Sequence, residues 1–104
     1  MIKHIVIWKL KEEAEGSSKV QNATKMKQLL ENLIGIIPEI VRLEVGLKTS
    51  QSPANNDDII VVSEFKTWED LDIYANHPEH VKVGEFVKKV AEKRSAVDYF
   101  SNVE

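Results

Sequence analysis

The sequence predicts a single α+β domain in which strands and helices follow the order βαββαβ. Three observations lead to this prediction. A segment with helical periodicity follows the first strand-like segment, a second helical segment follows two consecutive strand-like segments, and residues 59–65 are apolar at nearly every position. Such a run is typical of a strand that is covered on both faces. Two right-handed crossovers then give a four-stranded antiparallel sheet with both helices on one face.

The composition is that of an ordinary soluble domain. The 104 residues include 14 Lys and Arg against 17 Asp and Glu, which gives a net charge of −3, and 42% are hydrophobic. We therefore expect one domain over residues 1–104. The chain has no cysteine, which excludes disulfides and thiolate metal sites. Without a basic cluster, a long apolar segment or a signal peptide, it is expected to be cytoplasmic and to bind neither nucleic acid nor membranes.

The first half of the chain predicts a strand, a helix and a second strand. Residues 2–10 alternate as a strand, with apolar side chains on both faces. A helix begins at an N-cap that is either Ser17 or Ser18, and it continues until Pro38 stops it. Residues 40–48 then alternate as a half-buried strand with one polar face.

The second half predicts two strands that flank two helices. Thr67 begins the first helix in a capping box with Asp70, and Pro78 suits the first turn of the next. In order, the predicted elements are an exposed connection over 49–58, a strand over 59–65, a short helix from Thr67 to Asn76, a helix from Pro78 to about Arg94, and a strand over 96–100.

The predicted sheet has one face without helices. The first and third strands are apolar on both sides, so this bare face carries either Val6, Trp8, Val61 and Phe65 or their alternating neighbours. A partner usually buries an apolar patch of that size. We expect an isologous homodimer, or a larger assembly of such dimers, in which two sheets pack face to face and close a barrel. An RNA-binding sheet is disfavoured because the third strand lacks an aromatic pair for base stacking.

Residues that could carry chemistry are concentrated in the segment from Tyr74 to His80, with His4 on the first strand. Histidine exchanges protons near neutral pH, and a tyrosine hydroxyl can donate to a developing oxyanion. Such a pair suits enolisation or aldol-type chemistry on a carbonyl compound without a cofactor. Structural roles remain open: His77 as a helix cap, His80 bonded to a carbonyl, and His4 as a hydrogen-bonded strand residue. Two histidines at i, i+3 are too few ligands for us to expect a metal.

Four segments resemble signatures of the stress-responsive dimeric α/β-barrel (Dabb) family, and together they extend from Met1 to about Phe100. The resemblance implies a ferredoxin-like monomer and a dimeric barrel. The segments are Ile2-Lys3-His4-Ile5-Val6-Ile7-Trp8-Lys9, Ser63-Glu64-Phe65 with Glu69-Asp70-Leu71, Tyr74-Ala75-Asn76-His77-Pro78-Glu79-His80, and Arg94-Ser95-Ala96-Val97-Asp98-Tyr99.

The family also suggests site residues. It includes a plant polyketide cyclase whose tyrosine and histidine, at positions matching Tyr74 and His80, act as an acid–base pair. The resemblance implies His80 as general base, Tyr74 as hydrogen-bond donor and His4 as a positioning residue. The expected walls of the pocket are Met26, Leu30, Val61 and Trp8.

Other functions stay open at this point. Most members of the family have no assigned reaction, so the alternative is a non-catalytic stress-associated protein whose assembly is its function. Other proteins with a dimeric barrel include monooxygenases and haem enzymes, which is an analogy of fold alone.

Overall fold

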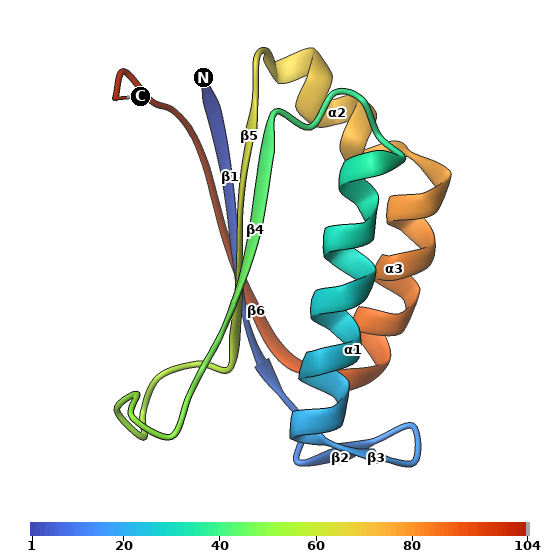
Figure 1. Ribbon diagram of the computed structural model, residues 1–104, viewed down its shortest axis with the longest axis vertical. Coiled ribbons are helices and arrows are strands. Elements are labelled where there is room, and N and C mark those ends of the chain that lie inside the picture. Colours follow the sequence, from blue (N-terminus) through green and yellow to red (C-terminus); the bar gives the residue numbers. More distant parts are fainter. Residues whose placement is uncertain (104) are drawn as a thin grey trace.

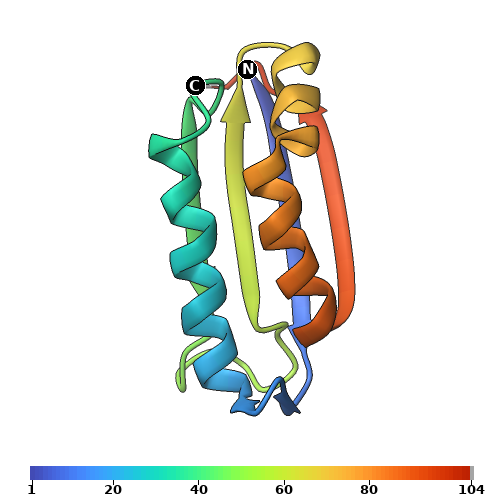
Figure 2. The same cartoon turned by 90° about the vertical axis from the view of Figure 1, so that its right-hand side faces the viewer.

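The computed structural model describes residues 1–103 and confirms the ferredoxin-like α+β fold. Four antiparallel strands form one sheet in the order β4-β5-β1-β6. All helices lie on the same side of this sheet (Figure 1), with α1 in front of the β4 side and α3 in front of β1 (Figure 2). The elements are β1 (Ile2–Leu10), β2 (Glu13–Ala14), β3 (Ser17–Ser18), α1 (Lys19–Glu31), the 3-10 helix η1 (Asn32–Gly35), β4 (Arg42–Leu47), β5 (Ile59–Phe65), α2 (Trp68–Asn76), α3 (Pro78–Val90) and β6 (Ala91–Phe100).

The start of α1 identifies its N-cap as Ser18. Gln21 N donates to Ser18 Oγ at 3.2 Å, and Ser18 N donates to Gln21 Oε1 at 2.9 Å, which completes a capping box. Just before it, β2 and β3 form a small antiparallel hairpin that was not among the predicted elements. Glu15 and Gly16 connect these strands with φ of 51° and 75°, as a turn between two tightly paired strands requires.

The boundary between α3 and β6 lies earlier than predicted. The helix ends at Val90, so Arg94, which was expected in the last helical turn, lies within β6. The reason is the ladder between β6 and β1, which extends from Leu10 opposite Ala91 to Ile2 opposite Phe100 with an irregularity between Lys9 and Leu10. Strand pairing outweighs the helical propensity of this segment.

The two faces of the sheet differ in what covers them. Val6, Trp8, Val61 and Phe65 point towards the helices and are buried in the core. Their alternating neighbours therefore form the other face, which no helix of residues 1–103 covers. We call this the open face; its central apolar residues are Ile5, Ile7, Ile60, Val62, Val97 and Tyr99.

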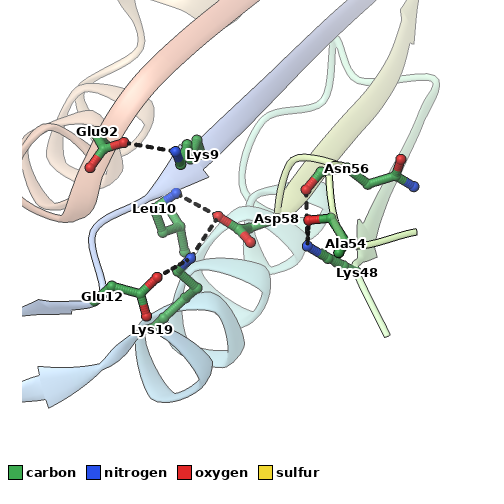
Figure 3. A network of polar contacts seen from close by, with 9 residues as sticks. All are labelled: Lys9, Leu10, Glu12, Lys19, Lys48, Ala54, Asn56, Asp58 and Glu92. Carbon is green, nitrogen blue, oxygen red and sulfur yellow. Dashed lines mark hydrogen bonds and ion pairs between the residues drawn. The ribbon is translucent and has the colours of Figure 1, made fainter. Parts of the chain in front are cut away.

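A polar junction ties the end of β1 to α1 (Figure 3). It consists of Leu10, Glu12, Lys19 and Asp58. The buried Asp58 carboxylate accepts a hydrogen bond from Leu10 N at 2.8 Å and lies 3.5 Å from Lys19 Nζ. Lys19 Nζ is also 3.0 Å from Glu12 Oε1, and this hydrogen bond is the main reason that the pKa of Lys19 is raised. In this junction Lys19 neutralises the buried Asp58 carboxylate, and Leu10 N donates a hydrogen bond to it.

The connection between β4 and β5 is fastened at the same end of the molecule. Lys48 Nζ donates to the carbonyls of Ala54 at 2.9 Å and Asn56 at 3.1 Å (Figure 3). The tip of the connection between β4 and β5 is exposed, as predicted.

Among the described residues, every helix is too short or too polar to cross a lipid bilayer.

Candidate functional site

A mostly apolar cavity of about 200 Å³ lies between the sheet and the helices of a single chain. Trp8 and Val61 face the helices, so the cavity lies on the helix side of the sheet and not on the open face. Of the seven predicted site residues, only Met26 is absent from its wall; Met26 is completely buried in the core. The other six, which line the cavity together, are His4, Trp8, Leu30, Val61, Tyr74 and His80.

The bend between α2 and α3 brings Tyr74 and His80 together. Pro78 cannot continue α2, and His77 caps α3 by accepting a hydrogen bond from Glu79 N on Nδ1 at 3.1 Å. Tyr74 at the end of α2 and His80 in the first turn of α3 consequently face each other, with ring centroids 4.3 Å apart. His77 therefore has the structural role considered for it, that of a helix cap.

Tyr74 is held as a protonated hydrogen-bond donor. Its side chain packs against Phe65, with ring centroids 5.0 Å apart, and the residue is only 1% exposed. This burial raises the pKa of Tyr74 to about 12, because the phenolate would lose its hydration. No residue of the described chain hydrogen-bonds to the hydroxyl, so its proton is available to a ligand in the cavity.

His80 is held as a neutral base. Its Nδ1 is 3.0 Å from the carbonyl oxygen of Ala75, which can only accept, so Nδ1 carries the proton and Nε2 keeps its lone pair. Burial is the largest cause that lowers the pKa of His80; the bond to Ala75 opposes it, and the charges of His4, Arg94 and His77 lower it further. At pH 7 the imidazole can therefore accept a proton at Nε2.

His4 has a partner that the sequence analysis missed. Asp98 Oδ1 accepts a hydrogen bond from His4 Nδ1 at 2.5 Å, and the two residues lie opposite each other in the β1–β6 ladder. The His4 ring then meets Tyr74 edge to face, with centroids 6.0 Å apart. Asp98 belongs to one of the four segments that resemble the family. Its contact with His4, however, follows from the register of β1 and β6 and could not be read from the sequence.

Taken together, these groups suit proton transfer at a carbon next to a carbonyl. A neutral imidazole and a protonated phenol lie side by side at the wall of an apolar cavity, where a hydrogen bond to a developing oxyanion is strong. Within residues 1–103, no three His, Asp or Glu side chains come together as a metal-binding group.

Comparison with known sequences identifies relatives over nearly the whole chain. The family profile described as Stress responsive A/B Barrel Domain (Dabb) matches residues 2–101. The stress-response A/B barrel domain-containing protein DABB1 of Arabidopsis thaliana is 26% identical over 97% of this chain. A second Arabidopsis thaliana protein, also described as stress-response A/B barrel domain-containing, is 28% identical over 98% of this chain. These matches cover 47% and 37% of the two relatives, so the chain spans less than half of either.

Solved structures show the same fold. A dimeric protein of unknown function with a ferredoxin-like fold from Bacteroides fragilis is 35% identical, with a TM-score of 0.85 over 96% of this chain and 95% of that one. A hydroxynitrile lyase from Passiflora edulis is 19% identical, with a TM-score of 0.79 over 99% of this chain and 94% of that one. Since the family profile extends from residue 2 to residue 101, the chain belongs to the stress-responsive A/B barrel domain family.

Proposed function

We propose that this protein binds a small apolar carbonyl compound in the cavity and performs cofactor-free acid–base chemistry on it. His80 is the general base, Tyr74 donates a hydrogen bond to the carbonyl oxygen, and His4 positions the Tyr74 ring. The observation that carries the proposal is the pairing of Tyr74 and His80, 4.3 Å apart at the cavity wall, with His80 Nδ1 bonded to Ala75.

The proposed step is enolisation. His80 Nε2 takes a proton from the carbon next to the carbonyl, the electron pair of that C–H bond forms the new C=C bond, and the C=O π pair moves to oxygen. The Tyr74 hydroxyl donates to this oxygen, and its raised pKa keeps the proton on Tyr74. Return of a proton from His80 to the same carbon gives exchange alone. Attack of the enolate carbon on a second carbonyl forms a new C–C bond, and the resulting alkoxide takes the proton from His80, which completes a cyclase-like reaction.

The fold is compatible with a lyase. The Passiflora edulis protein with this fold is described as a hydroxynitrile lyase, which at 19% identity supports the proposal by analogy of fold alone. Cleavage of a carbon–carbon bond next to a hydroxyl also needs a base, which takes the hydroxyl proton as C=O forms and the C–C bond breaks, and a donor that stabilises the departing anion.

Deuterium exchange tests this function without knowledge of the substrate. In D₂O, the protein should accelerate exchange of the protons next to the carbonyl in members of a ketone panel, followed by NMR. His80→Gln and Tyr74→Phe should each reduce the acceleration about 100-fold or more. The rate should rise with pH through a value below 6.5, the ordinary pKa of histidine, and then level off.

The matched control is His77→Asn, because asparagine is a good N-cap and His77 does not line the cavity. This variant should exchange protons like the wild type. Exchange that the wild type fails to accelerate for every ketone, or that survives His80→Gln, contradicts the proposal.

We further propose that two copies pair through the open face, as an isologous dimer. Its centre is apolar, and the relative from Bacteroides fragilis, at 35% identity, is described as dimeric. Val62→Asp should give a monomer in analytical ultracentrifugation, whereas Val81→Asp, on the exposed side of α3, should leave the dimer intact. A wild type that sediments as a monomer, or a folded Val62→Asp dimer, would reject this interface.

The second candidate is a non-catalytic stress-associated protein whose assembly is its function. The names of the two Arabidopsis thaliana relatives favour it, because they refer to stress response and to no reaction. A stable dimer or larger assembly together with no exchange activity would support this alternative.

A further inference from the structure

We propose that the end of the cavity formed by Trp8, Lys88 and Arg94 binds a carboxylate. The ligand is then a carbonyl compound that also carries a carboxylate, with an apolar spacer between the two. This inference rests on the proposed carbonyl site at Tyr74 and His80, and it adds the second group of the ligand.

Trp8 supplies the first observation. The residue is 5% exposed and lines the cavity, yet its indole Nε1–H is shielded from solvent and has no hydrogen-bond partner among residues 1–103. Buried tryptophan N–H groups usually find an acceptor, because an unpaired donor is costly. Trp8 also lines an adjoining hollow of about 230 Å³.

Arg94 supplies the second observation. It lies opposite Trp8 in the β1–β6 ladder and lines both the cavity and the adjoining hollow. Neither Arg94 nor Lys88, which lines the same two spaces, has an ion-pair partner in the described chain. The one carboxylate of the hollow, Glu92, is 3.2 Å from Lys9. Two solvent-exposed cations without ion-pair partners in the described chain therefore line the same cavity as Trp8.

This combination is selective for a carboxylate. A guanidinium binds a carboxylate through two parallel hydrogen bonds, and an indole N–H donates well to an anionic oxygen. The field of Arg94 reaches the rest of the site, since its charge is among the causes that lower the pKa of His80. A neutral polar group could accept from the indole N–H but would gain no attraction from the charges of Arg94 and Lys88.

The spacing along β1 defines the length of the ligand. His4 marks the end of the cavity beside Tyr74 and His80, and Trp8 lies four residues further on the same face, about 13 Å away at a strand rise of about 3.3 Å per residue. Between them the walls are apolar, formed by Val6, Leu30 and Val61. An aromatic ring or a short alkyl chain fits as the spacer between carbonyl and carboxylate.

Three matched probes test the two ends separately. Para-acetylbenzoate carries both a ketone and a carboxylate, para-methylacetophenone carries only the ketone, and para-ethylbenzoate carries only the carboxylate. A Trp68→Phe background leaves Trp8 as the sole tryptophan, so one indole N–H resonance reports on this end of the cavity. Both carboxylates should move that resonance downfield on titration, and para-methylacetophenone should not.

The affinity for a probe should depend on the probe's carboxylate and on the charge of Arg94. Para-acetylbenzoate should bind about tenfold or more tightly than para-methylacetophenone. Arg94→Gln should remove this preference and leave the affinity for para-methylacetophenone unchanged. The control Lys89→Gln removes one positive charge from α3 outside the cavity and should keep the preference.

The outcomes separate this inference from the proposed function. Equal affinity for para-acetylbenzoate and para-methylacetophenone overturns the carboxylate site, even if binding still depends on Tyr74 and His80. A para-ethylbenzoate shift at Trp8 that Arg94→Gln abolishes supports the carboxylate site even if no ketone exchanges its protons. Binding by none of the three probes contradicts both.

Discussion

The polar junction at Asp58 and the cavity are both built against β1, but they treat polar groups in opposite ways. In the junction, Asp58 accepts from Leu10 N and faces Lys19, so its buried carboxylate is bonded within the chain. In the cavity, the buried Trp8 indole N–H is without a hydrogen-bond partner in the described chain. Bonded buried groups stabilise the fold, whereas the groups left unbonded at a cavity are those a ligand would use.

Among the substitutions that test this contrast by removing a polar group, the largest effect should come from Asp58→Ala. Removal of the carboxylate leaves the buried Leu10 N–H without its acceptor and leaves Lys19 paired with Glu12 alone, so the free energy of unfolding should fall by about 2–3 kcal/mol. Urea denaturation at a fixed protein concentration measures this, because a dimer's stability depends on concentration. Asp57→Ala, at the exposed neighbouring position, is the control and should stay close to wild type. Equal losses for both variants would mean that the junction is not a structural centre.

A smaller effect is expected from Trp8→Phe. The substitution removes buried volume and also removes the unpaired N–H, two changes that act in opposite directions. The free energy of unfolding should change by less than about 1 kcal/mol, compared with about 3–5 kcal/mol for Trp8→Ala. If Trp8→Phe is as destabilising as Trp8→Ala, the indole N–H has a structural partner, and the contrast between junction and cavity fails at this residue.

The smallest effect is a change in pH dependence at His80. Its pKa is lower in the folded chain than the ordinary value of 6.5, so the unfolded chain binds more protons below that pH. The wild type should therefore lose stability as the pH falls through 6.5, and this loss should be weaker in His80→Gln. Urea denaturation over a series of pH values from about 8 to about 5 compares the two slopes. Identical slopes would show that the cavity does not hold His80 as a neutral group.

Local patterns were sufficient to predict most elements of the fold. Alternation identified β1 and β4, a nearly continuous apolar run identified β5, and the Ser and Thr caps and Pro78 marked where helices start. The same patterns failed where distant pairing decides the outcome. Ala91 to Ser95 contains good helix formers, so helical periodicity alone could not show that the ladder with β1 begins at Ala91.

The sequence was sufficient to name most residues of the candidate site, but it could not show which of them are in contact. Tyr74 and His80 are close in sequence, and a bend at Pro78 was expected, so their proximity could be anticipated. His4 and Asp98 are 94 residues apart and meet only through the β1–β6 register. The side of the sheet that Trp8 faces was equally unpredictable, because both faces of β1 are apolar.

The two ends of the described chain lie side by side, where Ser101 N donates to Met1 O at 2.8 Å (Figure 1). A circular permutant that joins these ends and opens the connection between β4 and β5 would keep the strand order of the sheet. In that chain β6 and β1 would become a hairpin, and the contact between Asp98 and His4 would become local in sequence. Because local contacts cost less entropy to close, the permutant should form this part of the site earlier in folding than the natural order of elements does.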